Sequence, residues 1–191
     1  MSLCLLKPAS QAVIARRQTL ALLMGLAVAG KANATPALAS IAGLRLPLVQ
    51  AAQGKFANQA WNGLSHLGSE DFKGHWIYLD FWASWCAPCR QSFPWMNSIH
   101  DKFEPLGLQI VAVGLDKKPE PMQSFLNSTK PRFSILWDRT SAWAEKLQIQ
   151  SMPASVLIKP DGQMMAWHKG FSREMVQKVE AQLSQWLLEK S

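Results

Sequence analysis

Two cysteines lie close together near the middle of the chain, Cys86 and Cys89, with Ala87 and Pro88 between them. A thiol must ionise before it can attack a disulfide. The first turn of a helix has unpaired backbone N–H groups and the positive end of the helix dipole, and both stabilise a thiolate. Pro88 suits such a turn because its φ is fixed and it has no N–H. The pair predicts thiol–disulfide exchange, with Cys86 exposed ahead of the helix as the attacking thiol and Cys89 beneath it as the resolving thiol.

The cysteine count favours a chemical role over a structural one. The chain has three cysteines, and the third, Cys4, lies in a leader segment. A bridge between Cys86 and Cys89 closes almost no loop, so it adds little stability by constraining the unfolded chain. The alternative is half of a zinc site, which needs two further ligands at metal-binding spacing. The four histidines are scattered singly, at His66, His75, His100 and His168. We therefore expect no metal and no other cofactor.

The first 34 residues have the pattern of a secretory signal peptide. They hold four basic residues and no acidic ones, an apolar run over residues 20–29, and small residues at Ala32 and Ala34. The apolar run is shorter than the ~20 residues that span a bilayer. We expect cleavage after Ala34, export to the periplasm, and a mature domain over residues 35–191 without a membrane span. Arg16-Arg17 leaves both the general secretory and the twin-arginine routes open.

Charge and composition exclude some classes of protein. The formal charge is +7, and removal of residues 1–34 leaves 16 basic and 13 acidic residues, a net charge of +3. The sequence therefore has no basic stripe that would follow a phosphate backbone, and we expect no nucleic-acid partner. With 48% hydrophobic and 17% charged residues, the chain is typical of a globular domain. We expect it to be a monomer.

Hydrophobic patterning indicates the elements that position the two cysteines. A buried strand over residues 76–82 leads to the cysteines, and a helix follows from Cys89 to about residue 104. The elements expected after it are a strand at 109–115, a helix at 121–128, a strand at 133–136, a helix at 141–147, strands at 155–159 and 163–168, and a helix capped by Ser172. Short strands are expected within residues 35–75. This order predicts a parallel core closed by an antiparallel hairpin, with helices on the sheet.

Several of these motifs resemble the thioredoxin superfamily. Residues 80–90, Asp-Phe-Trp-Ala-Ser-Trp-Cys-Ala-Pro-Cys-Arg, are similar to its active-site segment, and so are Pro94 and the Ser-Met-Pro run that ends at Pro153. An added helix and strand within residues 108–171 resemble the exported TlpA/ResA-type thiol–disulfide oxidoreductases. The resemblance covers about residues 65–190. It implies an α/β thioredoxin-like fold with a central mixed sheet flanked by helices, an extra helix–strand insert and an N-terminal extension. It also implies a cis peptide bond before Pro153, facing the disulfide.

The sequence departs from that branch at the acidic positions. Many members have Asn at the position of Asp80 and Glu at the position of Ser92, and the cytochrome-maturation members have Glu at the position of Ala154. Asp80 is therefore the candidate general acid/base. Burial on a strand raises the pKa of a carboxyl group, so Asp80 can exchange a proton with Cys89. The alternative is a structural aspartate held by a nearby donor.

The remaining candidates concern substrate binding. Trp85 is expected to shield the dithiol and to form part of the substrate surface, whereas Trp82 belongs to the buried strand and is expected to pack in the core. Pro153 has no N–H, and we expect its neighbours Met152 and Ala154 to pair with the substrate backbone as a strand.

Three functions follow from these residues. The leading one is a periplasmic reductase of protein disulfides, with protein thiol/disulfide substrates and a membrane-linked electron donor. The second is a non-catalytic binding or chaperone module that uses the same surface. The third is a copper-delivery protein, because thiolates are suited to Cu(I); Met152 is the one further ligand candidate near the pair.

Overall fold

The computed structural model describes residues 41–54, 61 and 63–188, all within the unit Ala34–Ser191. The expected leader and its cleavage site lie outside the described residues. Among the helices of the described segments, none has the length and apolar character needed to cross a membrane.

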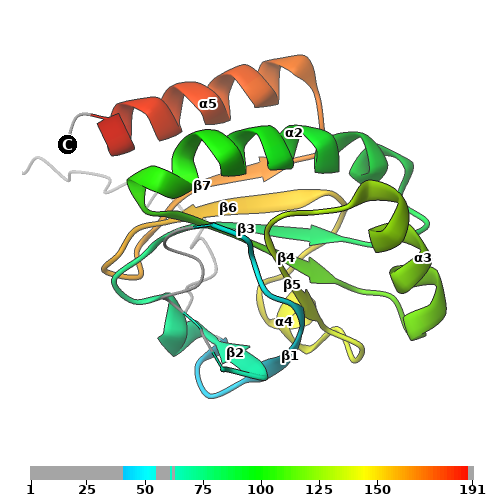
Figure 1. Ribbon diagram of the computed structural model, residues 1–191. Helices are drawn as coiled ribbons and strands as arrows, with labels where there is room; N and C mark the ends of the chain where they lie inside the picture. The colour runs from blue at the N-terminus through cyan, green and yellow to red at the C-terminus, as the bar shows by residue number, and fades with distance from the viewer. Residues whose placement is uncertain (1–40, 55–60, 62, 189–191) are drawn as a thin grey trace, which may run out of the picture. The chain divides into compact units, whose positions relative to one another are not determined.

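One mixed sheet organises the described residues (Figure 1). Its strands are β1 (Arg45–Gln50), β2 (His66–Gly68), β3 (Trp76–Trp82), β4 (Leu108–Gly114), β5 (Ser134–Trp137), β6 (Ala154–Ile158) and β7 (Met164–Lys169). The strand order is β2-β1-β5-β4-β3-β6-β7. Strands β3, β4 and β5 are parallel, β6 runs antiparallel to β3, and β7 runs antiparallel to β6. The predicted parallel core and closing hairpin are therefore confirmed.

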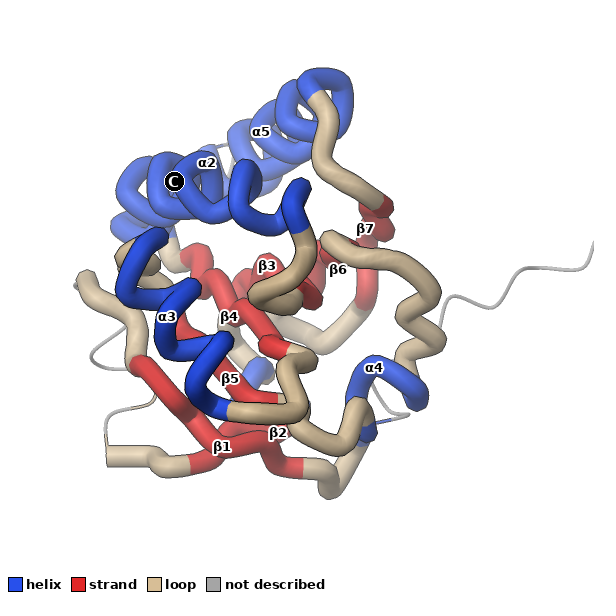
Figure 2. Tube along the Cα trace, turned by 90° about the vertical axis from the view of Figure 1, so that its right-hand side faces the viewer, coloured by secondary structure: helices blue, strands red, loops and turns tan. Residues whose placement is uncertain are grey.

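Helices cover both faces of this sheet. They are α2 (Ala87–Phe103), α3 (Pro119–Thr129), α4 (Ala142–Lys146) and α5 (Arg173–Leu188), with short 3-10 turns at Ser69–Phe72 and Glu104–Leu106. Apolar side chains of α2, α3 and α5 belong to one buried cluster, and those of α4 belong to a second. Figures 1 and 2 show α2 and α5 together over the same face of the sheet. The predicted α/β fold is thus confirmed.

Strand β3 lies at the centre because both of its faces are apolar. All seven of its residues are buried. Tyr78 and Trp82 belong to the cluster beneath α2, whereas Ile77 and Phe81 belong to the opposite cluster, as the two-residue period of a strand requires. The stripe predicted for α2 is also buried, at Phe93, Met96, Ile99 and Phe103.

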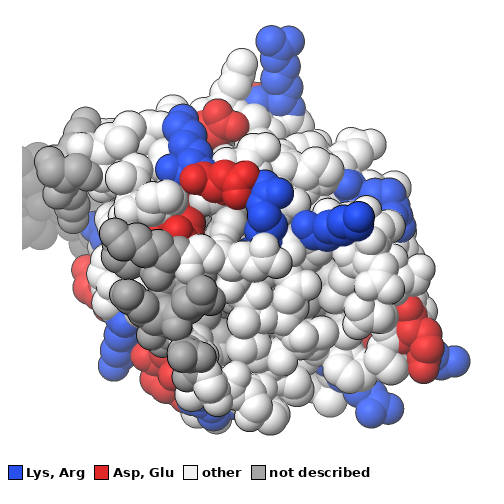
Figure 3. Space-filling view, viewed as in Figure 1, with Lys and Arg blue, Asp and Glu red and all other residues white. Residues whose placement is uncertain are grey.

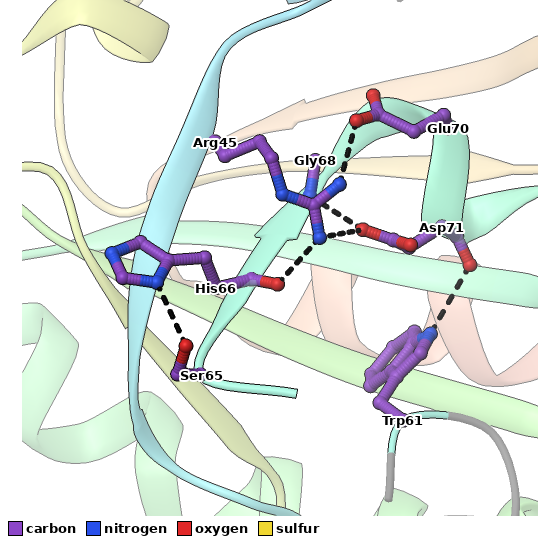
Figure 4. Close-up of polar contacts among 7 residues, drawn as sticks. All are labelled: Arg45, Trp61, Ser65, His66, Gly68, Glu70 and Asp71. Atoms are coloured by element: carbon purple, nitrogen blue, oxygen red, sulfur yellow. Dashed lines mark hydrogen bonds and ion pairs between the residues drawn. The ribbon is translucent and has the colours of Figure 1, made fainter. Parts of the chain in front are cut away.

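The N-terminal extension lengthens the sheet beyond β5. Strand β1 pairs antiparallel with both β5 and β2. Figure 4 shows how the segment after β2 is attached: Arg45 forms ion pairs with Glu70 at 2.7 Å and with Asp71 at 3.0 Å. The Asp71 carboxylate also accepts the backbone N–H of Gly68 at 2.8 Å, and its carbonyl accepts the indole N–H of Trp61 at 3.1 Å. The short strands were predicted, but their place beside β5 was not.

Candidate active site at the start of helix α2

The two cysteines form a disulfide at the N-terminus of α2. Cys86 is the N-cap residue, and its sulfur accepts the backbone N–H of Cys89 at 3.2 Å. Pro88 lies in the first turn, as predicted. The Cys86 sulfur is therefore at the position where the helix dipole and free N–H groups favour a thiolate over a thiol.

The two sulfurs differ in access to solvent, although less than expected. Cys86 is 5% exposed and Cys89 is fully buried. The expectation of an exposed Cys86 is wrong for this disulfide form, because its sulfur is bonded to that of Cys89 inside the core. Cys86 is nevertheless the more exposed of the two residues.

The loop before Cys86 is held by Asp116, which sequence reasoning missed. Its carboxylate accepts the Ser84 backbone N–H at 2.9 Å and the Ser84 hydroxyl at 2.6 Å, and its carbonyl accepts the Trp137 indole N–H at 2.6 Å. Asp116 is 4% exposed. A signal was present: Asp116 follows β4 closely, and β4 runs parallel to the strand that leads to the cysteines. The carboxyl ends of parallel neighbours meet at one edge of the sheet.

Asp80 lies on the sheet face that packs beneath α2. It alternates with Tyr78 and Trp82, which belong to the same buried cluster as Cys89. Asp80 is 2% exposed, and its Oδ2 has no hydrogen-bond partner among the described residues. Burial raises the pKa of this carboxyl well above its ordinary value of 3.8. The structure thus has a buried acid with a raised pKa on the sheet face that packs beneath α2.

Two hydroxyl groups adjoin Asp80, and neither was singled out in the sequence. Ser155 of β6 is the register partner of Asp80, and its Oγ accepts the hydroxyl hydrogen of Tyr78 at 2.8 Å. Burial, and then the charge of Asp80, raise the pKa of Tyr78 well above its ordinary value, against the effect of the Ser155 hydrogen bond. A serine inside a predicted buried strand was the available signal.

The Met152–Pro153 peptide bond is cis, as the resemblance implied. Met152 is half-buried and packs against the cluster that contains both cysteines. Ala154 does not fit its expected role. It is the first residue of β6, between Phe81 of β3 and Lys169 of β7, so its backbone is already inside the sheet. Of the two neighbours of Pro153, Met152 is the one that lies outside a strand and can offer its backbone to a substrate.

The two tryptophans before Cys86 have different environments. Trp82 is fully buried, with ring centroids 4.8 Å from Phe93 and 4.5 Å from Phe125, which confirms its expected place in the core. Trp85 is 71% exposed, more than any other large hydrophobic side chain of the described segments. An exposed indole beside a disulfide is a ready contact surface for a peptide.

Two further properties of the described residues bear on a metal site and on a basic surface. Within residues 41–54, 61 and 63–188, no cluster of three or more His, Cys, Asp or Glu side chains could hold a metal ion. On the face seen in Figure 3, basic and acidic side chains are interspersed, and no continuous basic stripe crosses that face.

Comparison with known proteins agrees with this geometry. The model of the AhpC/TSA family matches residues 50–166. The thiol-disulfide oxidoreductase ResA of Bacillus thuringiensis subsp. konkukian is 28% identical over 118 residues, which cover 62% of this chain and 65% of the relative. ResA of Bacillus subtilis is 30% identical over 95 residues, which cover 50% and 53%. The chain thus spans less than two thirds of the length of these relatives.

A solved structure matches over a longer part of the chain. It is described as a thiol:disulfide interchange protein DsbE from Chlorobium tepidum, with 35% identity and a TM-score of 0.62. The match covers 75% of this chain and 95% of that one. The disulfide at a helix start, the cis-proline and these similarities agree, and the chain belongs to the thioredoxin-like AhpC/TSA family.

Proposed function

We propose that the protein is a thiol–disulfide oxidoreductase that reduces protein disulfides through Cys86 and Cys89. The observation that carries this proposal is the disulfide at the N-terminus of α2, where the Cys86 sulfur accepts a backbone N–H. That position stabilises the thiolate form of Cys86 and so activates it as a nucleophile.

The reaction proceeds in two exchanges that balance in electrons and protons. The Cys86 thiolate attacks a substrate disulfide, forms a mixed disulfide, and releases one substrate thiolate. Asp80, as carboxylate, then takes the proton of Cys89, and the new thiolate attacks the Cys86 sulfur. The second substrate thiolate leaves as the Cys86–Cys89 disulfide closes. Two electrons pass from the dithiol to the substrate, and the released thiolates take protons from water.

Substrate contact is assigned to the surface around the disulfide. Trp85 provides an exposed apolar plane beside Cys86. Met152 packs against the same cluster and precedes the cis-proline, which supports a role for its backbone in pairing with an extended substrate segment. Pro153 lies between Met152 and the sheet, and its own carbonyl already accepts the N–H of Gly170 at 2.8 Å.

The proposal also names the direction of the exchange, which is reduction of the substrate, and the compartment in which it takes place. We propose that the buried acid Asp80 assists deprotonation of Cys89, the step that releases reduced substrate, and that the protein is therefore a reductase. The sequence of residues 1–34 supports export to the periplasm, and the mature domain over residues 35–191 would act there as a monomer, recharged by a membrane-linked donor. N-terminal sequencing of periplasmic protein should begin at Thr35.

The test uses two cysteine variants and a redox titration. Cys86→Ser should abolish turnover of a protein disulfide, and Cys89→Ser should accumulate mixed disulfides. Equilibration with glutathione should give a potential nearer thioredoxin, about −270 mV, than DsbA, about −120 mV. Unchanged turnover in Cys86→Ser would refute the mechanism, and a potential above about −180 mV would refute the direction. A binding module would show no turnover at all, and a copper carrier would retain copper after purification.

A further inference from the structure

His168 is a buried titratable residue that the mechanism above does not use. It lies on β7, the last strand of the sheet, and is 5% exposed. Neither of its ring nitrogens has a hydrogen-bond partner among the described residues. A polar side chain buried without a partner costs free energy, so this position calls for a reason beyond packing.

The register of the sheet places His168 in line with Asp80. Asp80 of β3 is directly opposite Ser155 of β6, and Ser155 is directly opposite His168 of β7. Directly opposed residues point to the same face of a sheet, with Cβ atoms about 4.5–5.5 Å apart. Asp80, Ser155 and His168 therefore form one row of polar side chains across three strands, on the face beneath α2 and α5. We call these three residues the polar row.

The chemistry of Asp80 creates a need for such a row. Burial favours the protonated form of this carboxyl, so Asp80 must lose a proton before it can accept the one on Cys89. The side chain is 2% exposed, so it has little direct contact with bulk water. A hydroxyl group donates and accepts hydrogen bonds, and a neutral imidazole has one donor and one acceptor nitrogen. Ser155 and His168 are thus residue types that can transfer a proton.

Burial and a nearby positive charge favour the neutral form of the His168 ring. Burial, and then the charge of Lys178 on α5, lower the pKa of His168. Glu180, on the same helix, accepts the indole N–H of Trp95 at 2.8 Å. On β3, the titratable groups of this sheet face are Asp80 and Tyr78, and the Tyr78 hydroxyl donates a hydrogen bond to Ser155. A neutral ring leaves one nitrogen free to accept a proton. His168 lies on β7, the last strand of the sheet, so the row ends at the edge of the sheet.

We propose that His168, acting through Ser155, carries protons between Asp80 and solvent at the β7 edge of the sheet. Among the described residues, the structure shows no hydrogen bond at Asp80 Oδ2 or at either ring nitrogen, so the transfer takes place when the three side chains rotate into contact. The O–H bond of Asp80 then breaks as its proton passes to the Ser155 oxygen, Ser155 gives its own hydroxyl proton to one ring nitrogen, and the other ring nitrogen releases its proton to water. Asp80 is then the carboxylate that accepts the proton of Cys89. This inference rests on the proposed thiol–disulfide exchange.

The test measures the lifetime of one mixed disulfide against pH. Reduced protein is mixed with oxidised glutathione, samples are quenched in acid, and the glutathione adduct on Cys86 is followed by mass spectrometry. His168→Gln should lengthen the adduct's lifetime at least about threefold near pH 7. This is a small part of the roughly 10²–10⁴-fold rate increase that general acid–base catalysis supplies. Formation of the adduct should stay within about twofold of the wild-type rate. The two proteins should converge at alkaline pH, where Asp80 is already ionised. His66→Gln, at an exposed position of β2, is the matched control.

Two further variants separate a relay from a packing effect. Ser155→Ala should lengthen the lifetime with the same pH profile while leaving the ring in place. In an Asp80→Asn background, His168→Gln should add no further delay, because its action passes through Asp80; a packing effect would add to the delay instead. Wild-type lifetimes in both His168→Gln and Ser155→Ala, or a delay that is equal at every pH, would overturn the inference. Failure of the wild-type protein itself to form the adduct on Cys86 would instead refute the proposed function.

Discussion

The buried carboxyl of Asp80 makes a specific prediction about stability and pH. In the folded protein burial raises the pKa of Asp80 well above its ordinary value of 3.8, to which the unfolded chain returns it. Between these two values the folded state holds a proton that the unfolded state has released. The folded state is therefore destabilised as pH rises above about 4. Asp80→Asn has the same shape and never ionises, so it removes this destabilisation.

The size of the effect follows from proton linkage. One proton held only by the folded state changes the free energy of unfolding by about 1.4 kcal/mol for each pH unit. The difference in unfolding free energy, Asp80→Asn minus wild type, should therefore increase by about 1.4 kcal/mol per unit from pH 4.5 upward. The increase stops once the folded carboxyl ionises. Every other titratable group is common to both proteins and cancels in the difference.

Urea unfolding of both proteins in the disulfide form, at half-unit intervals from pH 4.5 to 8, measures this difference. Asp161→Asn, the same substitution in the exposed turn before β7, is the matched control. A pH dependence that both variants share would not be assigned to Asp80. A difference that stays flat between pH 5 and pH 7 would show that Asp80 is ionised in the folded protein. The role of Asp80 as a proton acceptor with a raised pKa would then be refuted.

Two further perturbations test the supports of the site. Asp116→Ala removes the acceptor of two hydrogen bonds from Ser84 and should cost about 3 kcal/mol of unfolding free energy in urea, while Asp116→Asn should recover part of the loss. Equal stability of Asp116→Ala and wild type would mean that the loop before Cys86 needs no anchor. Trp85→Ala removes a side chain that is 71% exposed, so stability should change by less than about 0.5 kcal/mol. The KM for a protein disulfide should rise, and the rate with oxidised glutathione should not change; an equal loss with both substrates would refute a substrate-binding role.

Local patterns in the sequence were sufficient for the elements around the dithiol. Strand β3 has the predicted bounds, because a run of seven residues that are all apolar or aromatic except Asp80 has few alternatives to a central strand. Helix α2 begins at Ala87, two residues before the predicted start, and Cys86 is its cap. The cis bond before Pro153 followed from the resemblance, not from the residues alone.

Features that depend on register could not be predicted in this way. The pairing of β1 with β5 joins segments more than eighty residues apart. The unsuitability of Ala154 for substrate pairing, and the alignment of Ser155 with His168, both depend on which residues are opposed across β3, β6 and β7. A shift of one residue would invert every side chain, and periodicity within a single strand does not fix that choice.

The hydrogen bond from the Cys89 N–H to the Cys86 sulfur links electron transfer to folding through a thermodynamic cycle. In the oxidised protein the acceptor is a neutral sulfur, and after reduction it is a thiolate, which accepts the bond more strongly. Reduction and unfolding form a closed thermodynamic cycle of four states. The unfolding free energies of the oxidised and reduced protein therefore differ by the same amount as the reduction free energies of the folded and unfolded protein. Denaturation curves for the oxidised and reduced forms, compared with the reduction potential of the unfolded chain, therefore give the potential of the folded site, at about 30 mV for each 1.4 kcal/mol.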